Sequence, residues 1–190
     1  MRVGILGLQG SVEEHLLFLR KLVGNSSVHL VKKASDVDGL DGLVMPGGES
    51  TTIGKLMQRY KIDEAIKEND ELAIMGTCAG AILLAKEIEG SDQFALGLMD
   101  MEVERNAYGR QKESFEADIE IPSLGEKLFK AVFIRAPVIK EVGKGAEVLA
   151  RHNDEPVLVK QDKYIVCTFH PELTEDSRIH QYFLAMIKNG

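Results

Sequence analysis

Short apolar runs alternate with amphipathic stretches through the first half of the chain. Apolar runs of about 4–8 residues that end in glycine, proline or polar turns are typical of strands buried in a sheet. Apolar residues three or four positions apart are typical of helices that pack one face on a sheet. The runs predict strands at Arg2–Leu8, Val28–Lys32, Gly42–Met45 and Leu72–Met75.

Helices are predicted between and after these strands. Ser11 is placed to cap the first of them, and Glu14 would complete a capping box with it. Further helices are predicted to begin near residues 50–52, to span Ala81–Ile88, and to span about Asp176–Lys188. Strands that alternate with helices favour a parallel sheet covered by helices on both faces.

The second half of the chain has shorter connections between its apolar runs. The strands predicted there are Met101–Arg105, Ser114–Ile121, Ala131–Ile134, Val148–Arg151, Pro156–Lys160 and Tyr164–Phe169. Some of them are expected to pair as hairpins, which would make the sheet mixed. The predicted fold class is therefore α/β. We expect a flavodoxin-like three-layer sandwich with a mostly parallel mixed central sheet, formed by a single domain over residues 1–190.

Composition narrows the function classes. The 190 residues are 44% hydrophobic, which suits one domain with a sizeable core. A net charge of −7 without a Lys/Arg-rich block argues against nucleic-acid binding. The apolar runs fall short of the about 20 residues needed to span a bilayer, and the N-terminus lacks signal-peptide anatomy. We therefore expect a cytoplasmic protein with no nucleic-acid or membrane partner.

The stretch Gly76–Gly80 (GTCAG) joins a predicted strand to a predicted helix. Small residues around a central Cys78 are typical of a nucleophile elbow, a tight turn that lifts its side chain to the carboxyl end of a sheet. The helix N-terminus favours the thiolate, and the N–H of Ala79 would face an oxyanion formed beside the sulfur. The alternative is a buried structural cysteine beside a glycine-rich turn.

His170 and Glu172 follow another predicted strand. His170 would act as the base for Cys78, and Glu172 would orient the imidazole and stabilise its charged form. An exposed loop histidine is the alternative. The stretch Pro46–Ser50 (PGGES) also follows a strand, and its glycines allow a backbone N–H to complete an oxyanion hole. A plain turn before a helix capped by Ser50 or Thr51 is equally compatible with it.

The remaining polar residues carry weaker signals. Cys167 lies in an apolar strand and is interpreted as a core residue, and two cysteines make no disulfide framework. The other histidines show no metal-ligand spacing, so neither a metal nor a cofactor is predicted. Arg105 and Arg135 lie near strand ends and are suited to gripping a carboxylate, although spacing alone does not select them. Gln9 borders the expected active edge, where it is equally compatible with a turn.

Taken together, these motifs resemble those of the class I (triad) glutamine amidotransferases. The resemblance is closer still to the glutaminase subunit of pyridoxal 5′-phosphate synthase, and it extends over essentially the whole chain. The stretches that carry it are Leu6–Gly10, Pro46–Thr52, Gly76–Ile88, Val103–Gln111, Ser114–Asp118, Phe133–Pro137 and Thr168–Thr174.

The resemblance implies a class I glutamine amidotransferase-like fold and a role for each candidate residue. It implies a catalytic triad of Cys78, His170 and Glu172, and a site for L-glutamine. The glutamine site would comprise Gly47, Gly48, Glu49, Arg105, Ile134 and Arg135, with an oxyanion hole at Gly48 and Ala79. Gln9 would be linked to activation. A partner synthase would take the ammonia to build the coenzyme, in an assembly of twelve glutaminase and twelve synthase chains.

Three alternatives remain open at this point. The same triad would serve a glutaminase of another pathway, such as histidine biosynthesis. A cysteine peptidase or chaperone-like protein has a similar elbow, but usually takes its histidine from the position beside the nucleophile, where this chain has Ala79. A binding module that has lost catalysis is the third, although an intact Cys/His/Glu set argues against it.

Overall fold

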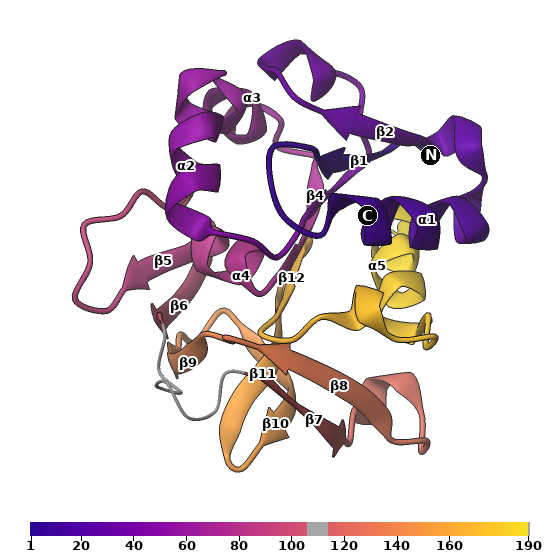
Figure 1. Ribbon diagram of the computed structural model, residues 1–190, viewed down its shortest axis with the longest axis vertical. Coiled ribbons are helices and arrows are strands. Elements are labelled where there is room, and N and C mark those ends of the chain that lie inside the picture. Colours follow the sequence, from indigo (N-terminus) through magenta and orange to yellow (C-terminus); the bar gives the residue numbers. More distant parts are fainter. Residues whose placement is uncertain (106–113, 190) are drawn as a thin grey trace.

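The computed structural model describes residues 1–105 and 114–189 (Figure 1). The stretch Val103–Gln111 contributes to the family resemblance, and its residues 106–111 lie outside the described residues. No helix in the described part of the chain is long and apolar enough to cross a membrane.

A seven-stranded sheet forms the centre of the molecule, in the order β10-β11-β12-β4-β3-β1-β2 (Figure 1). From β12 to β2 the neighbouring strands are parallel, whereas β11 pairs antiparallel with both β10 and β12. This confirms the mixed, mostly parallel sheet. The strands are β1 (Val3–Leu6), β2 (Val28–Val31), β3 (Gly42–Met45), β4 (Ala73–Thr77), β10 (Glu147–His152), β11 (Glu155–Gln161) and β12 (Tyr164–Cys167).

Helices cover both faces of this sheet, as expected for a parallel sheet that is buried on both sides. One face packs against α1 and α5, which contribute buried residues such as Leu19 and Phe183 to a single core cluster. The opposite face packs against α2, α3 and α4, with Ile53 and Ile66 in a second cluster. The helices are α1 (Val12–Val23), α2 (Ser50–Arg59), α3 (Ile62–Glu68), α4 (Ala79–Leu84) and α5 (Arg178–Asn189).

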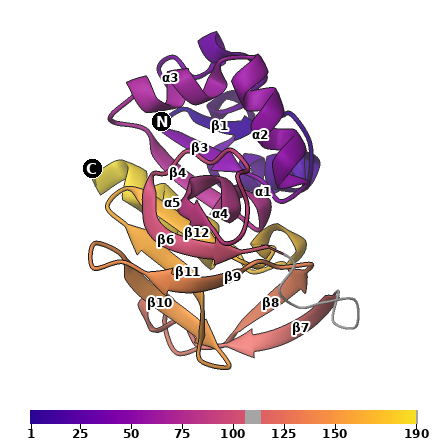
Figure 2. The ribbon, with the colours of Figure 1, turned by 90° about the vertical axis from the view of Figure 1, so that its left-hand side faces the viewer.

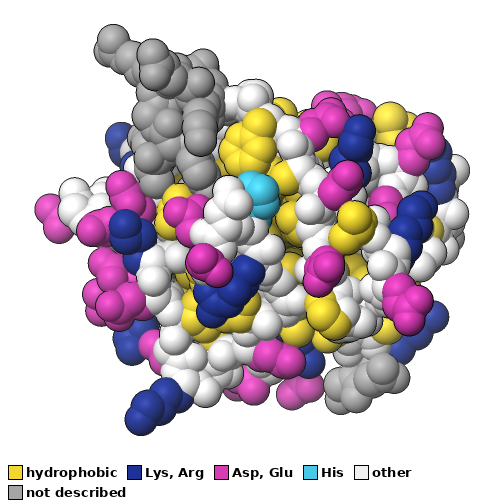
Figure 3. Space-filling model, turned by 90° about the horizontal axis from the view of Figure 1, so that it is seen from below, with side chains coloured by type: hydrophobic (Ala, Val, Ile, Leu, Met, Phe, Trp, Pro, Cys, Tyr) yellow, Lys and Arg dark blue, Asp and Glu magenta, His cyan; other side chains and the backbone are white. Residues whose placement is uncertain are grey.

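Two smaller sheets extend the core beyond the central one (Figure 2). The first has the order β5-β6-β9, and the second is the antiparallel pair β7–β8. Their strands are β5 (Ala85–Ile88), β6 (Met99–Glu104), β7 (Ser114–Ile119), β8 (Phe129–Ile134) and β9 (Val138–Val142). On the face seen in Figure 3, Lys and Arg side chains lie among Asp and Glu side chains, so the described residues there present no block of one charge.

Two local predictions were wrong. The helix expected over Ala81–Ile88 begins at Ala79 and ends at Leu84, and Ala85–Ile88 is the strand β5. Pairing with β6 provides backbone partners that the apolar pattern alone could not reveal. Ser11 makes no side-chain capping bond, because its hydroxyl donates to Glu172 instead. The capping box with Glu14 is therefore absent.

Candidate active site

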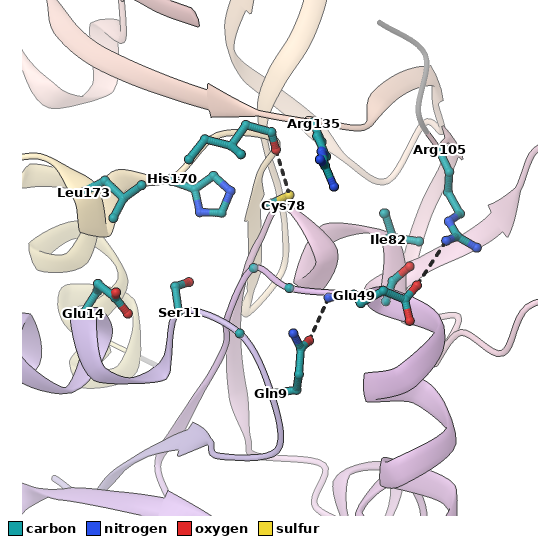
Figure 4. A pocket seen from close by; sticks show the side chains of 15 residues that line it. Gln9, Ser11, Glu14, Glu49, Cys78, Ile82, Arg105, Arg135, His170 and Leu173 are labelled. Atoms are coloured by element: carbon teal, nitrogen blue, oxygen red, sulfur yellow. Dashed lines mark hydrogen bonds and ion pairs between the residues drawn. The ribbon is translucent and has the colours of Figure 1, made fainter. Parts of the chain in front are cut away.

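Four neighbouring parallel strands end at the same edge of the sheet, and each is followed by candidate site residues. The loop after β1 carries Gln9, the loop after β3 carries the glycines 47–48, and β4 runs into Cys78. His170 follows β12, which lies beside β4. Segments far apart in sequence therefore meet in one pocket at the carboxyl edge, where open α/β sheets bind ligands (Figure 4).

Cys78 occupies a strained turn between β4 and α4. Its φ of 48° and ψ of −100° lie in a backbone region that residues other than glycine rarely adopt. The turn closes tightly because a Cβ on Gly80 would overlap the carbonyl oxygen of Met45, and one on Gly76 would lie 2.7 Å from the carbonyl carbon of Gly80. The Cys78 N–H is anchored to the carbonyl of Cys167 at 2.9 Å. This geometry agrees with the predicted nucleophile elbow.

His170 lies between Cys78 and Glu172. Its Nδ1 is 2.7 Å from Oε1 of Glu172, and its backbone N–H donates to the Val132 carbonyl on β8 at 2.8 Å. Burial alone would lower the pKa of His170, but a hydrogen bond with Cys78 and the contacts with Glu172 raise it to about 10. The ring therefore favours its charged form, which suits an imidazolium paired with a thiolate.

Glu172 is buried behind His170, and its side chain has no exposed surface. Ser11 donates to Oε1 at 2.6 Å, and Nε2 of His15 lies 3.4 Å from Oε2. Burial would raise the pKa of this carboxyl, but His15, His170 and the Ser11 hydroxyl together lower it to about 2. Glu172 is therefore an ionised partner for His170.

Ser11 and His15 were not identified from the sequence as site residues. His15 was dismissed because its spacing to the cysteines fits no metal site, and Ser11 was assigned to a helix cap. Both lie at the start of α1, distant in sequence from Glu172. The available signal was that α1 follows β1 directly, so that its first turn lies at the active edge.

The glycine loop after β3 is held from three sides. The Gly47 N–H donates to Oγ1 of Thr77 at 3.0 Å, and the Gly47 carbonyl accepts from the Ser11 N–H at 3.0 Å. Two residues further on, the N–H of Glu49 donates to Oε1 of Gln9 at 2.8 Å. Among the described residues, the intervening N–H of Gly48 has no acceptor.

Glu49 is the N-cap of α2, the role that the sequence suggested for Ser50 or Thr51. Its carboxylate accepts from the N–H groups of Thr51 and Thr52 at 3.2 and 2.7 Å. Hydrogen bonds from Thr52, and then from the backbone, lower the pKa of this exposed carboxyl to about 2. One guanidinium nitrogen of Arg105, at the end of β6, lies 3.4 Å from Oε1 of Glu49. A carboxylate and a guanidinium thus lie side by side at the pocket wall (Figure 4).

The pocket has a volume of about 580 Å³ and brings together nearly all the predicted site residues. Glu172 and Ala79 do not line it: Glu172 lies behind His170, and Ala79 is buried at the first position of α4. The Cys78 thiol points toward the Ile134 carbonyl at 3.8 Å. The lining residues are Gln9, Gly10, Ser11, Glu14, Gly47, Gly48, Glu49, Ser50, Cys78, Ile82, Arg105, Ile134, Arg135, His170 and Leu173.

Cys167 lies in the core, as its sequence context indicated. It is 1% exposed, and burial raises the pKa of its thiol well above the ordinary value, so it is not a second nucleophile. Across residues 1–105 and 114–189, no group of three or more His, Cys, Asp or Glu side chains is arranged to hold a metal ion.

The pocket combines a strained cysteine at an elbow with a histidine, a carboxylate and a glycine loop. This arrangement in an α/β fold is typical of proteins that catalyse acyl transfer through a thiolate. Comparison with known proteins narrows this class. The SNO glutamine amidotransferase family matches residues 5–189, and the chain belongs to that family.

Individual relatives match over the whole length. The pyridoxal 5′-phosphate synthase subunit PdxT of Brevibacillus brevis is 55% identical over 99% of this chain and 98% of its own. The protein of the same name from Thermotoga petrophila is 51% identical over 99% and 100%. A crystal structure described as a glutamine amidotransferase superposes with a TM-score of 0.92 at 50% identity, covering 99% of this chain and 100% of that one. The class I glutamine amidotransferase-like fold is confirmed.

Proposed function

We propose that this chain is a glutaminase that hydrolyses L-glutamine to L-glutamate and ammonia with a triad of Cys78, His170 and Glu172. The observation that carries the proposal is the continuous contact from the Cys78 thiol to the His170 imidazole, which both line the pocket, and on to the Glu172 carboxylate behind them. The arrangement supports the three roles of thiolate catalysis: Cys78 on an elbow would be the nucleophile, His170 beside it the base, and the ionised Glu172 the orienting group.

In the first half-reaction the Cys78 thiolate attacks the side-chain amide carbon of glutamine. The C–N bond breaks as the nitrogen takes a proton from His170. Ammonia departs, and a glutamyl thioester remains on Cys78. The tetrahedral oxyanion needs hydrogen-bond donors that are free before the reaction. The N–H of Gly48 has no acceptor among the described residues, and that of Ala79 is at the first position of α4, where no intrahelical acceptor exists.

In the second half-reaction His170 takes a proton from water, and the hydroxide attacks the thioester. The C–S bond breaks, glutamate leaves, and the thiolate–imidazolium pair is restored. Glu172 supports the charged ring in both halves, because it remains ionised in its buried position.

We assign the rest of the pocket to the amino-acid end of glutamine. Glu49 would accept from the α-ammonium group, and Arg105 and Arg135 would bind the α-carboxylate; the support for this is that all three residues line the pocket and carry the complementary charges. Gly47 and Gly48 would approach the substrate through their backbone, and Ile134 would close the pocket near the thiol. No metal or cofactor enters this mechanism.

The acceptor of the ammonia is proposed to be a pyridoxal 5′-phosphate synthase, because full-length relatives carry the name of a subunit of that enzyme. The complex would contain twelve glutaminase and twelve synthase chains and would work in the cytoplasm, with residues 1–190 as one amidotransferase domain. Gln9 is proposed to link docking to activity, because it holds the N–H of Glu49 beside the oxyanion loop.

The test is glutamate release from glutamine, measured for the purified chain alone and with the synthase chain added. Strong activation by the synthase is expected, because latent amidotransferases become active when the ammonia acceptor docks. If the synthase leaves the rate unchanged while a different ammonia-using synthase raises it, the chain is the glutaminase of another pathway. Peptide hydrolysis without glutaminase activity would favour the peptidase alternative.

A further inference from the structure

Two histidines lie fully buried behind the triad, one on α1 and one on α5. Nδ1 of His15 is 3.2 Å from Nε2 of His180, and both side chains are 0% exposed. The His180 ring stacks on Phe18 with centroids 4.4 Å apart. Buried ionisable rings are costly unless they are paired, so this pair needs an explanation beyond filling space.

His15 is in contact with two separate parts of the active site. Its Nε2 lies 3.4 Å from Oε2 of Glu172 and 3.3 Å from Oγ1 of Thr77. The other oxygen of Glu172 is already occupied by Ser11 and His170, whereas Oε2 has no well-formed hydrogen bond among the described residues. Nε2 of His15, at 3.4 Å, is therefore placed to serve that buried oxygen.

The ionised carboxylate determines which nitrogen of His15 carries the proton. Burial lowers the pKa of His15 and of His180, the latter to about 3, so both rings are neutral at pH 7. A carboxylate cannot donate and repels a nitrogen lone pair, so its contact favours the tautomer of His15 with the hydrogen on Nε2; in that tautomer Nδ1 accepts from His180. The atom of His180 then left without a partner is Nδ1, as the structure has it.

The second contact reaches the glycine loop. Oγ1 of Thr77 touches His15 and also accepts the N–H of Gly47 at 3.0 Å. Nε2 of His15 thus contacts both the Glu172 carboxylate, which also contacts His170, and the Thr77 hydroxyl. That hydroxyl in turn holds the glycine loop that contains the Gly48 N–H.

We propose that His15 is a positioning residue that fixes Glu172 and Thr77 relative to each other, so that the triad and the oxyanion loop stay correctly placed relative to each other. It does not touch the reacting atoms. The proposal rests on the glutaminase function proposed above and deepens it by adding a residue whose loss would weaken the chemical step more than substrate binding. A small misplacement of catalytic groups can cost about 100-fold in rate, so such a support has a measurable effect.

The experiment uses the full chain with its synthase and compares His15→Leu, His15→Gln and Leu19→Ala. Leu removes the donor, whereas Gln keeps an amide N–H for Glu172 and an oxygen for His180. Leu19 is a matched control, because it is equally buried on the same helix and its apolar side chain offers Glu172 neither a donor nor an acceptor. We expect His15→Leu to lower kcat about tenfold or more with little change in KM, and His15→Gln to recover most of it.

A second readout is independent of glutamine and of the synthase. Iodoacetamide alkylates an accessible thiolate, and Cys167 is buried with a raised pKa, so the rate at pH 7 reports on Cys78. We expect His15→Leu to slow alkylation and Leu19→Ala to leave it near the wild-type rate. If wild type hydrolyses no glutamine but the alkylation result holds, the proposed function fails and the positioning role survives.

Three outcomes would overturn the positioning role. His15→Leu could retain the wild-type kcat, it could raise KM alone, or Leu19→Ala could lose as much kcat at a similar melting temperature. The last would mean that the loss follows packing of α1 and not the contact with Glu172.

Discussion

Gly47 lies against the ring of His170, with no room for a side chain between them. A Cβ at position 47 would overlap Cε1 of His170 and lie 3.3 Å from Cβ of Cys78. The glycine therefore allows the loop after β3 and His170, the proposed catalytic base, to approach each other from two different strands. This is a requirement of close approach, since Gly47 has no positive φ.

Gly47→Ala should lower glutaminase kcat about 100-fold, because the methyl group displaces His170 from Cys78. The measurement is steady-state glutamate release by the variant in complex with the synthase. Gly7→Ala is the control, since the nearest atoms to its added Cβ are at 3.5 Å, an ordinary contact. Equal activity of the two variants would contradict the close approach of Gly47 to the triad.

Cys78→Ala should abolish glutaminase activity, by about 10⁴-fold or more, because no other described residue in the pocket offers a thiolate. Binding of the synthase should persist, since the buried cysteine contributes little surface. Co-elution of the two chains on gel filtration checks the second expectation. Glutamate formation at the normal rate would remove Cys78 as the nucleophile.

His170→Asn should reduce kcat more than Glu172→Gln does. We expect the kcat of Glu172→Gln to exceed that of His170→Asn by about tenfold or more. The reason is that Glu172 acts on the substrate only through His170. Single-turnover rates of thioester formation would separate the two. A larger loss at Glu172 would mean that it does more than orient the imidazole.

Acid should remove a stabilising contribution of Glu172. Folding lowers the pKa of this carboxyl from 4.5 to about 2, so the unfolded chain binds the proton more readily. The contribution is therefore fully present above about pH 4.5 and is lost as the pH falls through about 2. The melting-temperature difference between wild type and Glu172→Gln should shrink as the pH is lowered from about 6 toward 3. A difference that stays constant over this range would mean that the carboxyl is not held ionised.

Most of the fold and the main site motifs could be predicted from the sequence. The buried strands are continuous apolar runs, and the elbow and the loop after β3 each require small residues at fixed positions. Such features depend on neighbours in the chain, so a local pattern reveals them. The family resemblance then singled out Arg105 and Arg135, which spacing alone could not select.

Contacts between distant segments could not be predicted in this way. Ser11 looked like a helix cap and became a donor to Glu172, and Ala85–Ile88 looked helical and became a strand through its pairing with β6. His15 belonged to no motif, yet it borders Glu172 and Thr77.

The difference has one physical cause. Local sequence specifies backbone geometry, burial and the chemical nature of each group, so the elbow, the strands and the candidate nucleophile were already recognisable in the chain. Which groups become partners depends on the order of parallel strands β12-β4-β3-β1 in the sheet, because that order brings four separate strand ends together at one edge. Tertiary packing therefore selected the partners of Glu172, and with them the surroundings that keep it ionised.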